Sequence, residues 1–150
     1  MIYNLHNLLN LLTCFPRLCG DFEDSLTKFA VTGSQLKRIF GHIMRPENRA
    51  DKGECYQVSR GVRAVYNSAE RRLESLTIRG MPVVDEQTYS ICLTSYHLRN
   101  SAQLLNVTYE ELAELRRPRV VATSMRDVLE EHLRNNQNLN SKVEGRLVYK

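Results

Sequence analysis

The segment "TSYHLRNSAQLL", residues 94–105, gathers several reactive or polar side chains over a few positions: Tyr96, His97, Arg99, Asn100 and Ser101. Such side chains can serve as a nucleophile, a general base, metal ligands or the contacts of a ligand pocket. The first three roles need partners elsewhere in the chain, because a nucleophile requires a base and a metal ion requires several ligands.

The rest of the sequence offers no such partners at a recognisable spacing. It has no HExxH or DxH pattern, no CxxC pair, and no P-loop, GxGxxG or GxSxG motif. Glu130 and Glu131 are neighbours on an expected helix and point in different directions, so they do not form an acid/base pair. The isolated histidines and cysteines are His6, His42, His97, His132, Cys14, Cys19, Cys55 and Cys92. The sequence therefore predicts no catalytic residue and no metal ligand, which leaves ligand binding for residues 96–101.

Composition limits the class of protein. A chain of 150 residues with 42% hydrophobic and 25% charged residues suits one globular domain. The net charge of +4 is mild, and the longest basic cluster, "RRPR" at 116–119, is too short for a typical nucleic-acid site. No segment is long and apolar enough to span a bilayer. We therefore expect neither nucleic acid nor membrane as partner, and the scattered cysteines and the lack of a signal peptide favour the cytoplasm.

Hydrophobic periodicity predicts the elements that must position residues 96–101. Strands are expected over 25–32, 55–59, 61–67, 72–78, 88–96, 120–123 and 145–150, with a hairpin between 61–67 and 72–78. Helices are expected over 34–44, 108–115 and 125–135. These runs of strands predict an α+β fold with a mostly antiparallel or mixed sheet and helices packed on it.

The sequence also predicts the N-caps of these helices and which of their side chains face the core or the solvent. Ser34 is the expected N-cap of the first of these helices, Thr108 and Glu111 form a capping box, and Ser124 with Asp127 caps the last. His42 and His132 are expected to be exposed surface residues on their helices. On the last helix the residues expected to face inward are Val128, Leu129 and Leu133.

The amino-terminal residues 1–14 are expected to form an amphipathic helix, because leucines recur at 5, 8, 9 and 12. Its apolar face could pack on this domain, on sequence upstream or on another chain, so self-association stays open.

Several segments together carry a resemblance to a known family. They are "FEDSLTKFAVTGSQLKRIF", "GECYQVSRGVRAVYN", "LESLTIRGMPVVDEQTYSICLTSYHLRNS" and the closing "VEGRLVYK". In this order the chain, taken as a single domain over 1–150, resembles over residues 21–150 the C-terminal domain of the 5′-nucleotidase / UDP-sugar hydrolase / 2′,3′-cyclic phosphodiesterase family.

The resemblance implies that catalysis and nucleotide binding belong to two different domains. In that family a separate N-terminal metallophosphoesterase domain holds two divalent metal ions and hydrolyses the phosphoester, while the C-terminal domain binds the nucleotide. The metal-ligating motifs and the glycine-rich "N-G-G-x-R" segment of the family are absent from this sequence. The expected role is therefore nucleotide or nucleoside binding in nucleotide catabolism, with no cofactor in this chain and a metal pair in the N-terminal partner domain.

The resemblance also assigns site residues. The family holds the base between two aromatic rings, of which one aligns with Tyr96. The other aligns with Cys55, beside which Tyr56 is the available ring. The family's "G-G-D-G" loop corresponds to "RNSAQ", 99–103, where Asn100 and Ser101 are the candidate polar contacts. Alternation along the expected strand would point His97 away from Tyr96. The alternative interpretation is a non-enzymatic α+β interaction module or a degenerate fragment.

Overall fold

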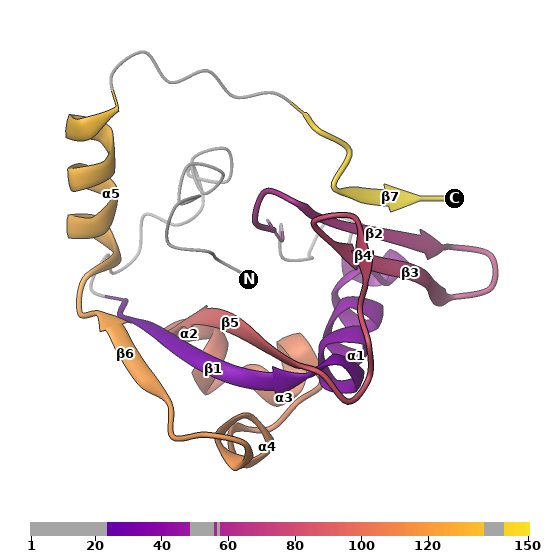
Figure 1. Ribbon diagram of the computed structural model, residues 1–150, viewed down its shortest axis with the longest axis horizontal. Coiled ribbons are helices and arrows are strands. Elements are labelled where there is room, and N and C mark those ends of the chain that lie inside the picture. The colour runs from indigo at the N-terminus through magenta and orange to yellow at the C-terminus, as the bar shows by residue number, and fades with distance from the viewer. Residues whose placement is uncertain (1–23, 49–55, 57, 137–142) are drawn as a thin grey trace.

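A central helix, α1 (Gly33–Ile43), lies between two β-sheets in the computed structural model (Figure 1). The structure describes residues 24–48, 56, 58–136 and 143–150. The expected helix over 1–14 and the residue Cys55 lie outside this part of the chain. The combination of helices with antiparallel and mixed sheets confirms the predicted α+β class.

The first sheet has the order β5-β1-β6. Its middle strand β1 (Leu26–Thr32) pairs antiparallel with β5 (Thr88–Thr94) and with β6 (Arg119–Ala122). Both neighbours come from much later in the chain, so this sheet brings the end of β5, where the candidate site begins, next to the start of β1.

The second sheet has the order β4-β3-β2-β7. The strands β2 (Val62–Asn67) and β3 (Arg72–Ile78) form the predicted hairpin, and β4 (Met81–Pro82) extends it. The closing strand β7 (Leu147–Tyr149) runs parallel to β2, so the sheet is mixed.

The helix α1 follows β1 without a loop. Thr32 Oγ1 accepts a hydrogen bond from the Gln35 amide at 3.1 Å, and Gln35 Oε1 accepts from the Thr32 amide at 2.9 Å. This reciprocal pair is a capping box. The prediction that Ser34 is the N-cap is therefore wrong, because Gly33 already has helical geometry and Ser34 lies within the first turn. A side chain at Gly33 is excluded, since a Cβ there would stand 1.9 Å from the Val84 carbonyl oxygen.

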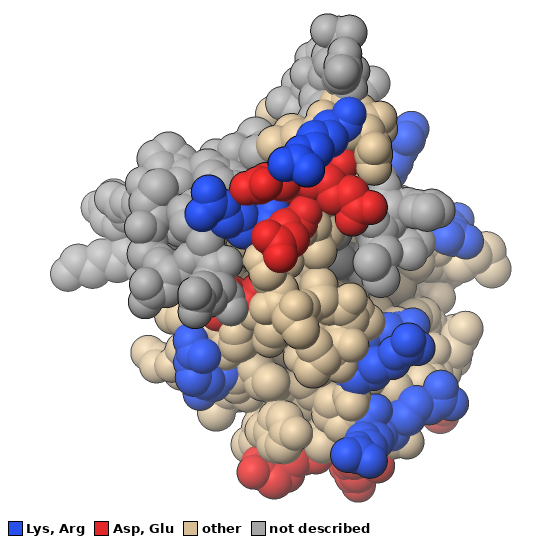
Figure 2. Space-filling model, turned by 90° about the vertical axis from the view of Figure 1, so that its left-hand side faces the viewer, with Lys and Arg blue, Asp and Glu red and all other residues tan. Residues whose placement is uncertain are grey.

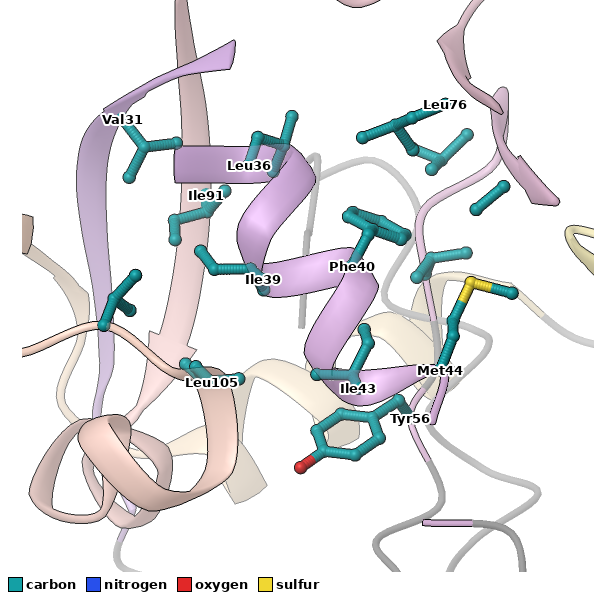
Figure 3. Close-up of a cluster of buried hydrophobic side chains, with 14 of the residues drawn as sticks. Val31, Leu36, Ile39, Phe40, Ile43, Met44, Tyr56, Leu76, Ile91 and Leu105 are labelled. Carbon is teal, nitrogen blue, oxygen red and sulfur yellow. The ribbon is translucent and has the colours of Figure 1, made fainter. Parts of the chain in front are cut away.

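The hydrophobic core surrounds α1 on both sides (Figure 3). Leu36, Ile39, Phe40 and Ile43 recur at helical spacing and are all at most 4% exposed. Figure 3 shows Val31 and Ile91 of the first sheet on one side of the helix and Leu76 of the second sheet on the other. One helix thus holds the two sheets together, and burial of this cluster is the main stabilising term of the fold.

The further helices that the structure describes range from five to eleven residues. They are α2 (Ser95–Arg99), α3 (Ser101–Leu105), α4 (Tyr109–Glu114) and α5 (Met125–Asn135), with a 3-10 turn η2 at Pro46–Asn48. The predicted capping box of Thr108 with Glu111 and the cap of Ser124 on Asp127 are confirmed. No helix within the described residues is long and apolar enough to cross a membrane.

Three local predictions are wrong. The strand expected over 88–96 ends at Thr94, where α2 begins. Of the strand expected over 55–59, the described residues show only an isolated bridge at Val58. Leu133, expected to face inward, is 40% exposed, because α5 buries mainly its first turn at Met125 against Leu26 and Cys92.

Candidate ligand-binding site

The candidate site lies where β5 gives way to α2. Thr94 has extended backbone angles, and its Oγ1 accepts from the His97 amide at 3.3 Å, so it caps the short helix. Tyr96 is therefore a helical residue and not the last residue of a strand. The chain turns by about 100° per residue in a helix but by 180° in a strand, so neighbouring side chains here are not on opposite faces.

The rings of Tyr96 and His97 contact each other as a consequence. Their centroids are 5.5 Å apart and their planes are inclined by 86°. Tyr96 is 39% exposed, whereas His97 is 5% exposed. The expectation that His97 points away from Tyr96 is therefore wrong: His97 lies behind the tyrosine ring and supports it from inside.

His97 is held in place by its own helix cap. Its Nδ1 lies 2.8 Å from Thr94 Oγ1, and both groups are buried. The Thr94 hydroxyl can donate to Nδ1 while its oxygen accepts from the His97 amide, an arrangement that suits a neutral imidazole. Burial lowers the pKa of His97 from its ordinary 6.5 to about 3 because the charged form would be desolvated.

Tyr56 lies on the inner side of this arrangement. Its ring centroid is 6.1 Å from that of His97, and its hydroxyl donates to the Leu104 carbonyl at 3.1 Å. Tyr56 is only 8% exposed. The structure thus brings Tyr56, His97 and Tyr96 into one row of rings, with Tyr96 at the exposed end.

Asn100 and Ser101 join α2 to α3. The Asn100 side-chain amide donates to the Tyr96 carbonyl at 2.9 Å, and its backbone N–H reaches the same oxygen at 3.2 Å. Asn100 is partly exposed, but Ser101 is 4% exposed. Asn100 therefore closes the end of the helix that carries Tyr96 and also reaches the surface beside it, whereas Ser101 lies inside.

A contact that the sequence did not reveal fixes the start of α2. Ser95 Oγ donates to Asp24 Oδ1 at 2.6 Å and accepts from the Ser25 amide at 3.2 Å. The guanidinium of Arg99 lies 3.8 Å from the same carboxylate. These partners are about 70 residues apart in the chain, so no local pattern could indicate them. Together they anchor the first turn of α2, and hence Tyr96, to the start of β1.

A second histidine, His42 near the end of α1, contacts α3. His42 Nε2 lies 2.8 Å from the Gln103 carbonyl oxygen and 2.9 Å from Arg45 Nη2. Burial lowers the pKa of His42 as well, and the positive charge of Arg45 acts in the same direction. The expectation that His42 is an exposed surface residue is therefore wrong: it is partly buried and holds α3 against the end of α1.

The described residues include no group of three or more His, Cys, Asp or Glu side chains arranged to hold a metal ion. The groups around Tyr96 include aromatic rings, an amide, hydroxyls and the charged pair of Arg99 with Asp24. Aromatic rings beside polar groups suit an organic ring with polar edges.

Comparisons with known proteins agree with this architecture. A family model described as "5′-nucleotidase, C-terminal domain" matches residues 19–108. No curated protein sequence matches the chain.

Among solved structures, the chain is similar to the 5′-nucleotidase precursor from Thermus thermophilus, with a TM-score of 0.65 and 15% identity over 85% of this chain and 25% of that one. The NAD nucleotidase of Haemophilus influenzae gives a TM-score of 0.65 and 14% identity, over 85% of this chain and 24% of that one.

The sulfate thiohydrolase SoxB from Thermus thermophilus gives a TM-score of 0.54 and 16% identity, over 85% of this chain and 22% of that one. At these identities the structural likeness establishes the fold alone, and the chain spans about a quarter of the length of these proteins.

Proposed function

Since this chain belongs to the family of 5′-nucleotidase C-terminal domains, we propose that it binds the nucleoside part of a nucleotide. The catalytic step would belong to a metallophosphoesterase domain supplied separately. The observation that carries the proposal is the exposed ring of Tyr96, supported from behind by the buried His97. This ring occupies the position at which the family resemblance expects a base-stacking aromatic residue.

Stacking on Tyr96 would provide much of the binding free energy. A base stacked on an aromatic side chain gains about 1–3 kcal/mol in nucleic-acid sites, and the ring does not need to select one base. The ring is also pre-organised, because His97, Thr94 and the Asp24–Ser95 contact fix the helix that carries it. Little conformational entropy would be lost when a base docks on it.

Polar contacts would come from the α2–α3 junction. Asn100 is partly exposed beside Tyr96 and can present its amide oxygen to the edge of a base, since its nitrogen is already bonded within the helix. Ser101 and Tyr56 are buried, so we propose that they form the buried bottom of the pocket and do not contact the ligand edge. Cys55 remains a predicted wall residue outside the described part of the chain.

The described residues do not fit the metal pair that phosphoester hydrolysis in this family needs. We therefore propose binding and presentation of the nucleotide as the role of this chain, and derive no hydrolytic step from it.

An amide-shift titration tests the proposal. Adenosine and AMP should both shift the amides of residues 94–103 in a saturable manner at about millimolar concentrations, whereas ribose 5-phosphate should leave them unchanged. Equal shifts with ribose 5-phosphate would instead indicate phosphate binding, and the absence of any shift at about 10 mM adenosine would refute nucleoside binding.

A further inference from the structure

Arg99 lies on the same side of α2 as the exposed ring of Tyr96. The two residues are three positions apart, and side chains at this spacing are neighbours on the surface of a helix. Tyr96 is 39% exposed, and the side chain of Arg99 is 68% exposed. The long side chain of Arg99 therefore borders the surface on which a ligand of Tyr96 would rest.

The guanidinium of Arg99 is turned back toward the first residue of α2. Long side chains in a helix lean toward its N-terminus. Arg99 Nη2 lies 3.8 Å from Asp24 Oδ1, the atom that accepts from Ser95 Oγ at 2.6 Å. Because Tyr96 directly follows Ser95, the ion pair with Asp24 holds the guanidinium beside the residue that carries the candidate stacking ring.

The N–H groups of Arg99 are not used by Asp24 as hydrogen-bond donors. A separation of 3.8 Å is longer than a hydrogen bond, so the carboxylate attracts the guanidinium without engaging its donors. The surface around α5 differs. There acidic and basic side chains lie side by side (Figure 2), and Arg126 Nε donates to Glu130 Oε1 at 3.0 Å. Arg99 therefore keeps donors that its ion pair does not occupy.

The charges around Arg99 favour a neutral acceptor over an anion. The carboxylate of Asp24 balances the charge of the guanidinium, and burial lowers the pKa of the neighbouring His97 to about 3, which keeps that ring neutral. A phosphate group would be attracted by Arg99 but repelled by the adjacent Asp24. A neutral nitrogen or oxygen acceptor avoids this repulsion.

The nitrogen N7 of a purine base is an acceptor of this kind. Arginine donates to N7 and O6 of guanine in the commonest base-specific contact of DNA-binding proteins, and N7 is an acceptor in adenine as well. Pyrimidines have no N7, and their smaller ring buries less area against an aromatic side chain. Recognition of N7 beside a stacking ring would therefore separate purines from pyrimidines.

We propose that Arg99 makes the site selective for purine nucleosides by donating a hydrogen bond to N7 of a base stacked on Tyr96. This inference rests on the proposed function, because it needs the base to lie on the Tyr96 ring. It adds the class of base that the site prefers and the residue that sets this preference.

The test compares adenosine with 7-deazaadenosine, in which a C–H group replaces N7 and the rest of the molecule is unchanged. In amide-shift titrations the parent chain should bind adenosine about three- to tenfold more tightly than the analogue, as expected for one exposed hydrogen bond to a charged donor. In Arg99→Met, which keeps an unbranched side chain but has no donor, the two ligands should bind equally. Cytidine and uridine should bind the parent chain more weakly than adenosine.

The ratio of the two affinities separates recognition of N7 from a structural effect of the substitution. If Arg99→Met only disturbed α2, both ligands would lose affinity and their ratio would persist, which would overturn the proposal. The matched control is Arg134→Met on α5, which removes another exposed helical arginine, one that lies 3.5 Å from Glu130. It should keep the ratio of the parent chain.

The remaining outcomes distinguish this inference from the proposed function. Equal affinity of the parent chain for adenosine and 7-deazaadenosine would overturn purine selection by Arg99 but leave nucleoside binding in place. Loss of AMP affinity without loss of adenosine affinity in Arg99→Met would assign the guanidinium to the phosphate and overturn the proposal too. Absence of adenosine binding to the parent chain would refute the proposed function and, with it, this inference.

Discussion

The ring of Tyr96 stands edge-on against the ring of His97, with 5.5 Å between the centroids and 86° between the planes. This is a favourable geometry for two aromatic rings, because the positive edge of one meets the negative face of the other. Since His97 is buried and bonded to Thr94, the exposed tyrosine has a fixed support on one side. Tyr96 itself is 39% exposed, and under the proposed function this exposed part of the ring would meet the base.

Acid should destabilise the fold through His97. Its pKa is about 3 in the folded chain and 6.5 ordinarily, so below pH 6.5 the unfolded chain binds a proton that the folded chain does not. The free energy of unfolding should therefore fall as pH falls from 6.5, by at most about 1.4 kcal/mol per pH unit from this group. Urea unfolding at several pH values between 7 and about 4.5 measures this slope.

The variant His97→Phe isolates that contribution. His42 also has a lowered pKa and adds to the slope in the same direction, so the difference between the parent chain and the variant is the informative quantity. The variant should be less sensitive to acid over this range. Identical slopes in the two proteins would show that His97 is not the buried neutral group described here.

The N-cap of α1 should make a measurable contribution to the free energy of unfolding. Thr32→Ala removes the hydroxyl that accepts from the Gln35 amide and should lower the free energy of unfolding by about 1 kcal/mol. Ser34→Ala is the matched control: its hydroxyl contacts only Thr32 Oγ1 among the described residues, and we expect a loss below about 0.5 kcal/mol. A larger loss for Ser34→Ala than for Thr32→Ala would contradict the assigned cap.

The pure 150-residue chain should not hydrolyse AMP. Under the proposed function the hydrolysis belongs to a separate metallophosphoesterase domain, whose metal ions would activate water and stabilise the phosphoryl oxygens. Phosphate release should stay at the rate of the buffer blank after addition of Mn²⁺ or Zn²⁺. Release that scales with protein concentration would show that the chain carries its own active site.

Regular strands and long helices could be predicted from the sequence because their side chains repeat. The hairpin of residues 61–67 with 72–78, the helix at 125–135 and the capping box of Thr108 all follow from such local patterns. The α2 helix has only five residues, too few for a helical period to be visible, so the apolar run of β5 suggested a strand through Tyr96.

The contacts that organise the candidate site could not be predicted from the sequence. The bond of Ser95 to Asp24 joins residues 71 positions apart, and the proximity of Tyr56 to His97 depends on how two sheets pack around α1. Tertiary contacts of this kind leave no signature in local propensity. The resemblance to a family indicated Tyr96 as a ligand residue, but only the fold shows that His97 supports it.

Calorimetric titration of adenosine into the parent chain, Tyr96→Ala and Tyr96→Phe tests the central claim most directly. Loss of the ring should weaken binding by about 1–3 kcal/mol, whereas the phenylalanine variant should bind nearly as tightly as the parent chain. Tyr109→Ala, which removes another exposed ring on α4, should leave the affinity unchanged. Undiminished binding by Tyr96→Ala would contradict the account.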